Sequence, residues 1–213
     1  ERTKMLFINS PHNPTGAVLS KEELGQIADF AKANNLLVVS DEAYDRLLYD
    51  GLEHRSIASE PGMRDRTVIL GSFSKTYSMT GWRIGYLAGP AEVIRGMALL
   101  QQSFVLSVNS FAQWGAVEAM TGPQDCVEEM RQQFDLRRKA MMEALSTIPN
   151  VSFAAPKGAF YIYLNHEKTG LDPVQFCAKL LDEYYVACVP GSEYGPYAGC
   201  NTRLSCATGL DDC

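Results

Sequence analysis

Six side chains in the first part of this 213-residue chain have functional groups suited to acid–base chemistry and phosphate binding: Asp41, Tyr44, Ser72, Ser74, Lys75 and Arg83. A lysine whose charged form is disfavoured offers a neutral amine, which acts as a nucleophile or a base. Arginine and serine bind phosphate oxygens, and a carboxylate pairs with a positively charged nitrogen. If these side chains share one site, its chemistry suits a phosphorylated ring.

The elements that must position them begin with a predicted strand, helix and strand. Met5–Asn9 has the character of a short buried strand. Ser20 and Glu23 form a capping box, and apolar residues recur behind it at helical spacing, so we expect a helix over residues 21–33. Leu36–Ser40 is a second apolar run, typical of parallel sheets that are covered on both faces. This order predicts a right-handed crossover between parallel strands.

Two further strands are expected to complete the sheet. Thr67–Leu70 predicts the third strand, and Ile84–Ala88 predicts the fourth. The fourth comes too soon for a parallel crossover, which needs about a dozen residues or more, so we expect it to run antiparallel. The carboxyl ends of three strands and the start of the fourth then share one edge, where open α/β sheets bind ligands. The residues expected at this edge are Asn13, Asp41, Ser72, Lys75 and Arg83.

Beyond residue 90 the pattern is first helical and then mixed. Helices are expected near residues 91–102, 110–120, 124–146 and 173–184. Strands are expected at Val151–Ala155, Ala159–Leu164, Val186–Val189 and Thr202–Ala207. The sequence therefore predicts an α/β fold, with a mostly parallel sheet in residues 1–123 and a smaller α+β domain in residues 124–213.

Composition gives no reason to expect nucleic acid, a membrane or a metal ion as a partner. The net charge of −6 and the isoelectric point near 5.1 do not favour nucleic acid or an anionic membrane. No apolar run approaches the roughly 18 residues that cross a bilayer, and the first residues are not a signal peptide, so we expect a cytoplasmic protein. The six cysteines form no C-x-x-C pair, so we expect free thiols and no metal site.

Five short strings together carry a more specific signal than any single residue. They are Asn13-Pro14-Thr15-Gly16, Asp41-Glu42-Ala43-Tyr44, Ser72-Phe73-Ser74-Lys75, Thr80-Gly81-Trp82-Arg83-Ile84-Gly85-Tyr86 and Asn201-Thr202-Arg203-Leu204-Ser205. In order and approximate spacing, the chain resembles the class I and II aminotransferases, which are fold-type I pyridoxal-phosphate enzymes. The resemblance covers essentially the whole chain. It implies pyridoxal 5'-phosphate as cofactor, an amino acid and a 2-oxo acid as substrates, and an incomplete large domain followed by the smaller one.

The resemblance also implies a role for each matching residue. The lysine that matches Lys75 holds the cofactor as a Schiff base and then moves the proton, so Lys75 is the expected catalytic residue. Asp41 matches the carboxylate that pairs with the pyridine nitrogen, whereas Glu42 is expected to face away. Tyr44 and Asn13 match the residues that contact the ring oxygen.

The phosphate and the substrate are expected to bind through other residues. Ser72 and Arg83 match phosphate ligands, and Ser74 is a weaker candidate for the same role. Arg203 matches the arginine that clamps the substrate α-carboxylate, and Asn13 is a second candidate for substrate binding. Closure of the smaller domain would then cover the substrate. Structural roles are the alternative: Asp41 as a cap, Asn13 as a turn residue and Arg203 as a surface strand residue.

Full-length relatives carry an N-terminal part that is absent here, so we expect this chain to match the C-terminal half or so of such a protein. The family forms homodimers, which the resemblance implies for this protein as well. Aspartate, aromatic and branched-chain amino acids all remain possible substrates. One aspartate-specific subgroup supplies an arginine from the segment matching Ser103–Gln113, which contains none here.

Two alternative functions remain open. A lyase or synthase of the same fold would use the same cofactor contacts, and product analysis distinguishes it, because only a transaminase yields a keto acid together with the aminated cofactor. The second alternative is the aminotransferase-like effector domain of a transcription regulator. That function predicts a basic helix-turn-helix upstream of this chain, which the complete gene sequence would reveal.

Overall fold

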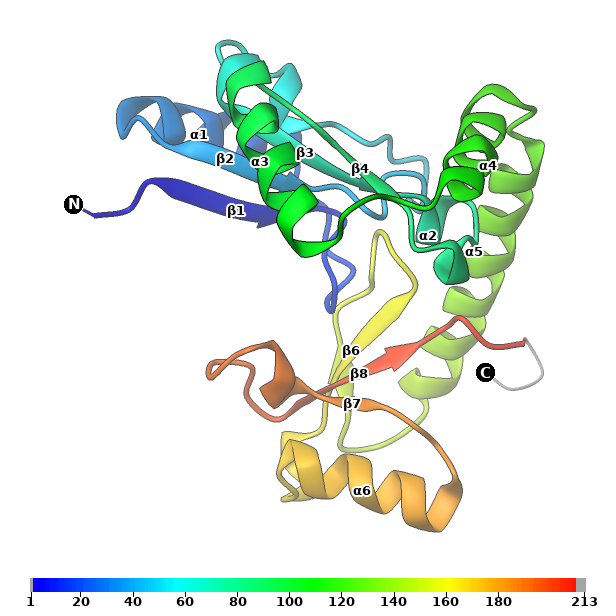
Figure 1. Ribbon diagram of the computed structural model, residues 1–213. Helices are drawn as coiled ribbons and strands as arrows, with labels where there is room; N and C mark the ends of the chain where they lie inside the picture. Colours follow the sequence, from blue (N-terminus) through cyan, green and yellow to red (C-terminus); the bar gives the residue numbers. More distant parts are fainter. Residues whose placement is uncertain (1, 210–213) are drawn as a thin grey trace. The chain divides into compact units, whose positions relative to one another are not determined.

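The computed structural model describes residues 2–209, which divide into two compact units (Figure 1). The first unit takes in residues up to Pro11 together with Val18–Glu128, and the second takes in His12–Ala17 with the chain from Glu129 onward. The expected domain boundary between residues 123 and 124 stays a prediction. Residues 210–213, which the smaller domain was expected to include, lie outside the described residues.

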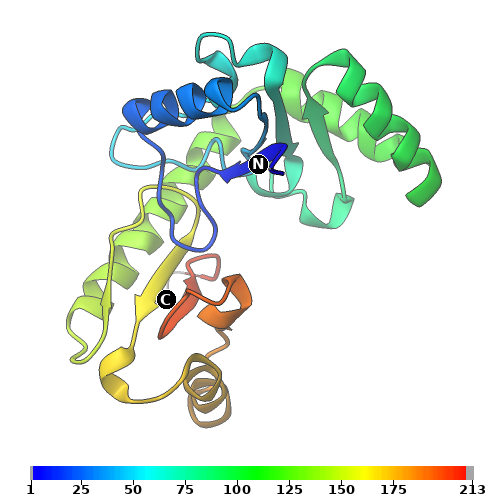
Figure 2. The same cartoon turned by 90° about the vertical axis from the view of Figure 1, so that its left-hand side faces the viewer.

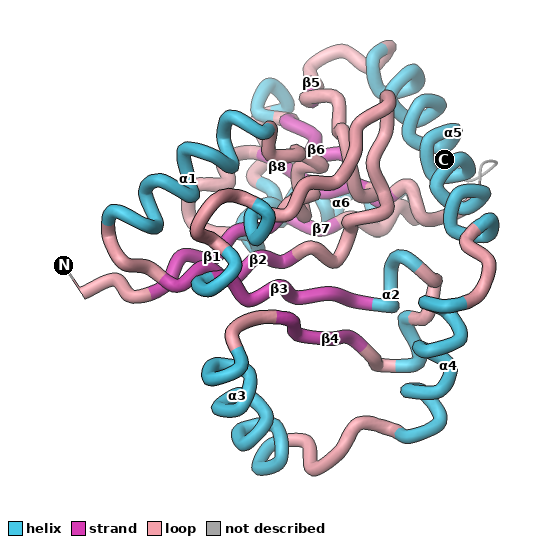
Figure 3. Tube along the Cα trace, turned by 90° about the horizontal axis from the view of Figure 1, so that it is seen from above, coloured by secondary structure: helices cyan, strands magenta, loops and turns pink. Residues whose placement is uncertain are grey.

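The first unit contains a four-stranded sheet in the order β1-β2-β3-β4 (Figure 3). Its strands are β1 (Met5–Asn9), β2 (Leu37–Asp41), β3 (Thr67–Ser72) and β4 (Gly85–Ala88). The first three strands pair in parallel, and β4 pairs with β3 in the antiparallel sense. The predicted α/β fold, the four strands and the reversed direction of the last strand are confirmed.

Helix α1 (Lys21–Ala33) begins at the predicted capping box. The Ser20 side chain accepts from the Glu23 backbone N–H at 3.2 Å, and the Glu23 carboxylate accepts from the Ser20 N–H at 2.7 Å. The buried face of the helix packs on one face of the sheet (Figures 1 and 2). This core contains Leu24, Ala28 and Ala31 of α1 with Leu6, Ile8 and Val38 of the strands.

Among residues 2–209, no element covers the other face of β1, so the expectation of a buried strand is wrong for β1 in this part of the chain. Met5 and Phe7 are 51% and 58% exposed, whereas Leu6 and Ile8 pack against the core under α1. Successive side chains of a strand point to opposite faces, so one row of β1 meets α1 and the other row does not. In addition, β1 is an edge strand and pairs only with β2 in the described sheet.

The remaining helices of the first unit lie between the strands or after β4 in the chain. They are α2 (Phe73–Thr76), α3 (Ala91–Phe104) and α4 (Ser110–Thr121), with short 3-10 helices at Ile57–Ser59, Arg64–Arg66 and Thr80–Trp82. Phe73 of α2 packs with Ala112 and Ala116 of α4 in a second core. Helix α5 (Asp125–Ser146) begins in the first unit and continues into the second. The helices expected after residue 90 are confirmed to within two residues.

The second unit contains an antiparallel sheet in the order β5-β6-β8-β7, with helix α6 beside it (Figures 1 and 2). Its elements are β5 (Ser152–Phe153), β6 (Tyr161–Asn165), α6 (Pro173–Tyr184), β7 (Val189–Pro190) and β8 (Asn201–Ser205), with 3-10 helices at Glu167–Thr169 and Gly191–Tyr194. The helix is confirmed as predicted, and the α+β character is confirmed with it.

The strands expected over 159–164 and 202–207 are confirmed as β6 and β8, each one residue shorter than predicted and with shifted ends, and the other two strands differ more. The strand expected over Val151–Ala155 is only the two residues of β5. The strand expected over Val186–Val189 begins at its last residue, because the preceding segment ends helix α6 instead. Tyr185 has φ +58°, and the Val186 N–H donates to the Leu180 carbonyl at 3.1 Å, as in a helix C-cap.

The segment His12–Ala17 is anchored within the second unit through Gly16. The Gly16 carbonyl accepts from the backbone N–H groups of Lys157 and Gly158 at 2.8 and 2.9 Å. Gly16 has φ +68°, and a Cβ atom there would lie 2.3 Å from the Pro156 Cβ. Only glycine therefore meets both the conformation and the close approach.

Two expectations from composition concern cysteines and membranes. The cysteines within residues 2–209, which are Cys126, Cys177, Cys188, Cys200 and Cys206, are free thiols as expected. Cys213 lies outside the described residues. Over the described part of the chain, no helix has the length and apolar character needed to cross a membrane.

Glu42 directly follows β2 and is a buried carboxylate, and its bond to Ser40, two residues earlier, places it on the side of Ser40, opposite to that of Asp41. It accepts hydrogen bonds from the Ser40 hydroxyl at 2.9 Å, the Ser56 hydroxyl at 2.5 Å and His54 Nε2 at 2.8 Å. Burial alone would raise the pKa of Glu42, but the hydrogen bonds from His54 and Ser56 outweigh it, so the pKa is lowered.

We predict that Glu42→Gln lowers the free energy of unfolding by about 1–3 kcal/mol near neutral pH, because it weakens hydrogen bonds to a charged group. A lowered pKa means that the carboxylate stabilises the fold above its unfolded pKa of about 4.3 and loses this effect as the pH falls through the folded value. Urea unfolding at several pH values between about 3 and 7 should therefore show a weaker acid dependence in the variant. Glu53→Gln, at an exposed position, is the control. An unchanged acid dependence in Glu42→Gln would contradict this role.

We predict that Gly16→Ala destabilises the second unit more than Gly170→Ala does. Gly170 also has a positive φ, of +73°, but a Cβ atom there meets nothing within 4 Å. Gly170→Ala therefore carries only the conformational cost of about 1–2 kcal/mol, whereas Gly16→Ala adds the overlap with Pro156, about 1–3 kcal/mol more. Denaturant unfolding of both variants measures the difference, and equal losses would show that the close contact relaxes without cost.

Candidate functional site

The register of the first sheet brings the expected strand ends to one edge. Asp41 lies beside Asn9 of β1 and Leu70 of β3, and Ser72 lies opposite Gly85 of β4. The carboxyl ends of β1, β2 and β3 and the start of β4 therefore share an edge, and α2 begins directly after β3. This places Asp41, Ser72, Lys75 and Arg83 on strand ends or on the segments that immediately follow or precede them.

Asp41 and Tyr44 lie at the end of β2 and in the turn that follows it. Asp41 is half-buried, and its Oδ1 accepts from the Ala43 backbone N–H at 3.1 Å. This bond closes a turn, and Asp41 does not cap a helix, because the next helical element begins only at Ile57. A carboxylate has several acceptor positions, so this one bond does not exclude a second partner. Tyr44 is only 5% exposed, so its ring is held within the unit.

Helix α2 positions Lys75 and the two serines before it. The Ser72 hydroxyl accepts from the Ser74 backbone N–H at 3.2 Å, which caps the helix. The Ser74 carbonyl accepts from the Thr80 hydroxyl at 3.1 Å, which links α2 to the next turn. Lys75 is half-buried, and it lies in the chain between Ser74 and the buried Thr76.

Arg83 lies two residues before β4, at the end of the 3-10 helix Thr80–Trp82, in an unusual backbone conformation. Its φ of +52° is in the left-handed region, which side chains other than glycine and asparagine seldom adopt. Its guanidinium Nη1 donates to the Thr80 carbonyl at 3.0 Å, and the residue is exposed. An exposed, permanently charged fork at this sheet edge is suited to binding a phosphate.

The second unit brings Asn13 and Arg203 together. Arg203 of β8 donates from Nη1 to the Asn13 side-chain oxygen at 3.0 Å. Its guanidinium carbon lies 4.3 Å from the ring centre of Tyr161 and 5.4 Å from that of Tyr194. Burial raises the pKa of Tyr194, and the positive charge of Arg203 opposes this shift. Arg203 is therefore held in a defined orientation by three neighbours and is not a loose surface residue.

Arg203 Nε is buried and has no hydrogen-bond partner among residues 2–209. A buried charged donor of this kind calls for an anionic acceptor, and a carboxylate matches the planar fork of arginine. The expected site omitted Tyr161 and Tyr194, which flank this guanidinium. For Tyr161 a signal existed, because its strand pairs with β8 and alternation places Tyr161 and Tyr163 on the face of Arg203.

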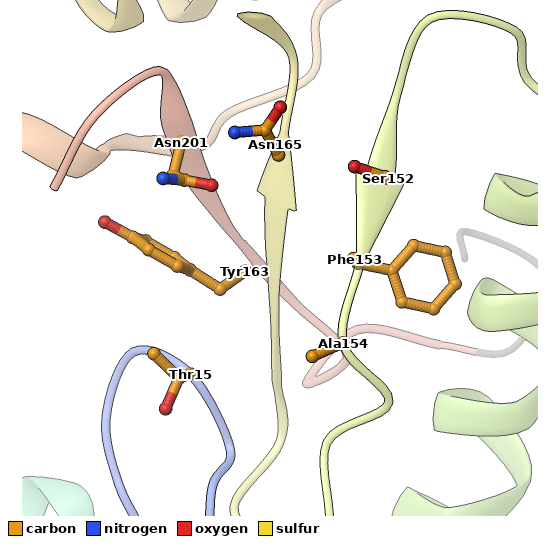
Figure 4. A pocket seen from close by; sticks show the side chains of 7 residues that line it. All are labelled: Thr15, Ser152, Phe153, Ala154, Tyr163, Asn165 and Asn201. Atoms are coloured by element: carbon orange, nitrogen blue, oxygen red, sulfur yellow. The ribbon is translucent and has the colours of Figure 1, made fainter.

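Two hollows adjoin this cluster within the second unit. One has a volume of about 380 Å³ and is lined in part by Asn13, Tyr163 and Tyr194. The other has a volume of about 280 Å³ and shares Thr15 and Tyr163 with the first. Figure 4 shows the side chains that line the smaller hollow, among which Tyr163, Asn165 and Asn201 supply polar groups.

The structure thus supports two groups of expected residues. Asp41, Tyr44, Ser72, Ser74, Lys75 and Arg83 belong to one sheet edge of the first unit, and Asn13 and Arg203 are hydrogen-bonded in the second unit. The expectation that Asn13 lies at the edge with Asp41 stays a prediction. An amine, a carboxylate, hydroxyls and a guanidinium on one edge form a donor set that fits a phosphorylated pyridine aldehyde.

Comparison with known proteins supports the same family. Residues 1–212 match the family described as aminotransferase class I and II. The chain is 44% identical to an aspartate aminotransferase of Bacillus sp. (strain YM-2), covering 99% of this chain and 55% of that protein. It is 41% identical to the aromatic-amino-acid aminotransferase 2 of Thermococcus litoralis, covering 99% of this chain and 54% of the relative.

A solved structure shows the same agreement in three dimensions. The aromatic aminotransferase from Pyrococcus horikoshii OT3 is 43% identical and matches with a TM-score of 0.94, covering 98% of this chain and 56% of that one. The chain spans about half the length of the relatives that it matches. From its sequence strings, its sheet and these matches, the chain belongs to the class I and II aminotransferase family, whose members use pyridoxal 5'-phosphate.

Proposed function

We propose that the complete protein is a pyridoxal-phosphate-dependent aminotransferase, which moves an amino group from an amino acid to a 2-oxo acid. The observation that carries this proposal is the position of Lys75. It lies on α2 directly after β3, at the sheet edge whose other strand ends bear Asp41 and Arg83. An acid, an amine and a phosphate-binding fork at one edge are what this cofactor requires.

The cofactor, when bound, accepts the electrons released when the substrate Cα–H bond breaks. Lys75 would hold the cofactor aldehyde through its amine and afterwards move the proton at the substrate Cα. Asp41 would accept a hydrogen bond from the pyridine nitrogen and keep it protonated, and Tyr44 would donate to the ring oxygen. Ser72, Ser74 and Arg83 would bind the phosphate.

Arg203 and Asn13 would bind the substrate. The guanidinium of Arg203 is oriented by Tyr161, Tyr194 and Asn13, and its buried Nε has no partner among the described residues. A substrate α-carboxylate supplies the missing acceptor and accepts two parallel hydrogen bonds. Holding the carboxylate in one place fixes the direction from which the α-amine approaches.

The relatives do not identify the amino acid substrate, because some are named for aspartate and others for aromatic amino acids. The segment Ser103–Gln113 holds no arginine that could bind a second carboxylate. A panel of aspartate, aromatic and branched-chain amino donors with 2-oxoglutarate ranks these substrates. We retain a cytoplasmic location as an expectation, which fractionation of the source cells tests.

We propose further that the complete protein is a homodimer. Large apolar side chains are exposed on α3, on α4 and on their connection: Leu99, Leu100, Phe104, Leu106, Phe111, Trp114, Val117 and Met120. Phe104 and Trp114 are 83% and 76% exposed. Apolar surface of this kind marks an interface, and a second subunit would remove it from water.

We therefore predict that sedimentation equilibrium of the complete protein gives the mass of two subunits. Replacing Phe104 and Trp114 by Glu should shift it toward one subunit, because a charge buried at an interface is costly. Leu181→Glu, at an exposed position on α6, is the control. A dimer that is unchanged by the Phe104 and Trp114 substitutions would assign this surface to another part of the complete chain or to another partner.

We predict that the complete protein develops a visible absorption band with pyridoxal phosphate and that Lys75→Ala abolishes the band without unfolding the protein. Lys21→Ala, at an exposed position on α1, should leave the band unchanged. A band that persists in Lys75→Ala would refute the assignment. Release of ammonia in place of a keto acid with aminated cofactor would indicate a lyase, and the absence of any turnover would favour a regulator domain.

A further inference from the structure

A hydrogen bond joins the two segments of the first unit that carry the proposed cofactor-binding groups. The Thr76 hydroxyl of α2 donates to Asp45 Oδ1 at 3.1 Å. Thr76 is the residue after Lys75, and Asp45 is the residue after Tyr44. The contact therefore bridges the turn that follows β2 and the helix that follows β3, which are not neighbours in sequence.

The Asp45 end of this bond is held by a closely connected turn. Asp41 Oδ1 accepts from the Ala43 N–H at 3.1 Å, and the Asp45 N–H donates to the Glu42 carbonyl at 3.0 Å. The Leu47 N–H then donates to the Tyr44 carbonyl at 2.9 Å. Asp41, Tyr44 and Asp45 consequently belong to one hydrogen-bonded turn segment.

The Thr76 end belongs to an element that needs outside support. Helix α2 has only four residues, and a helix this short has no stability of its own. Phe73, one turn before Thr76, packs against α4, and Thr76 itself is only 4% exposed. The hydroxyl of Thr76 thus donates from a buried position on the same turn as Lys75.

The surroundings of Asp45 favour a role toward α2 over a surface ion pair. Arg46 is also near Asp45: its Nε lies 4.0 Å from Asp45 Oδ2, and its side chain is 63% exposed. An exposed pair at this distance contributes little. The hydroxyl-to-carboxylate bond is shorter and charge-assisted. Burial raises the pKa of Tyr86, and the nearby negative charge of Asp45 adds to this shift.

We propose that Asp45 and Thr76 are positioning residues that hold the Lys75 amine in register with Asp41 and Tyr44. This inference rests on the proposed function, since the residues it positions are the proposed cofactor contacts. Lysine has a long and flexible side chain, so fixing its backbone restricts the region that its amine reaches. The hydrogen bond sets the distance between helix α2 and the turn that follows β2. It does so beside Lys75 on the helix and Tyr44 in the turn.

The test removes each partner in the complete protein and measures how the cofactor is taken up. Thr76→Val keeps the shape of the side chain and removes the donor, Thr76→Ser keeps the donor, and Asp45→Ala removes the acceptor. The rate at which the Lys75-dependent visible band grows in cofactor-free protein, and the pH midpoint of that band, report on the position and environment of the amine. Neither readout depends on turnover.

We expect Thr76→Val and Asp45→Ala to slow the growth of the band by about tenfold, the effect of a loss of about 1.4 kcal/mol of transition-state stabilisation, and to shift its pH midpoint. Thr76→Ser should restore both readouts. The double variant Thr76→Val with Asp45→Ala should resemble either single variant, because the two residues act through one bond. Thr121→Val, in which a hydroxyl that bonds within α4 is removed, is the matched control and should behave as the unmodified protein does.

The outcomes separate this inference from the proposed function. If the unmodified protein forms no Lys75-dependent band, the proposed function fails, and this inference fails with it. If the band forms but Thr76→Val and Asp45→Ala match the unmodified protein in rate and pH midpoint, only the positioning role is overturned. If Thr76→Val does not fold, Asp45→Ala decides by the same two readouts. Strictly additive effects in the double variant would also overturn the role, since they would show that the residues act separately.

Discussion

The pairing register of the first sheet is the constraint on which the proposed site depends. Parallel pairing of β1, β2 and β3 brings their carboxyl ends to one edge, and the antiparallel β4 returns to the same edge. Side chains alternate between the two faces, so a slip of one residue in β2 would exchange the faces of Asp41 and Glu42. The chemistry expected at the edge therefore depends on backbone hydrogen bonds some distance from it.

Glu42 helps to oppose such a slip. In the observed register its carboxylate meets Ser40, His54 and Ser56, which satisfy a buried charge on the face that α1 helps to cover. After a slip, Asp41 would point into this polar network with a shorter side chain, and Glu42 would lose its three donors. Buried carboxylates are costly without partners, so this network favours one register over its neighbour.

Local patterns were sufficient to predict much of the fold. The capping box fixed the start of α1, the apolar runs marked β2 and β3, and the short interval after Lys75 set the direction of β4. Other features depend on contacts between distant segments. The exposed row of β1, the shortening of β7 by the cap of α6, and the tyrosines around Arg203 are examples. The hydrogen bond between Asp45 and Thr76 is another example, because no local sequence pattern indicates that these two residues make contact.

The left-handed backbone conformation of Arg83 lowers the stability of the fold, whereas its guanidinium serves the proposed phosphate binding. Glycine or asparagine adopts a φ near +52° at lower cost, by about 1–2 kcal/mol for glycine, so selection for thermal stability alone would tend to replace this arginine. The replacement would remove the guanidinium that we assign to phosphate. Variant libraries designed to raise the thermal stability of this protein should therefore leave position 83 unchanged. The substitution there that stabilises the fold most also removes the proposed phosphate-binding guanidinium.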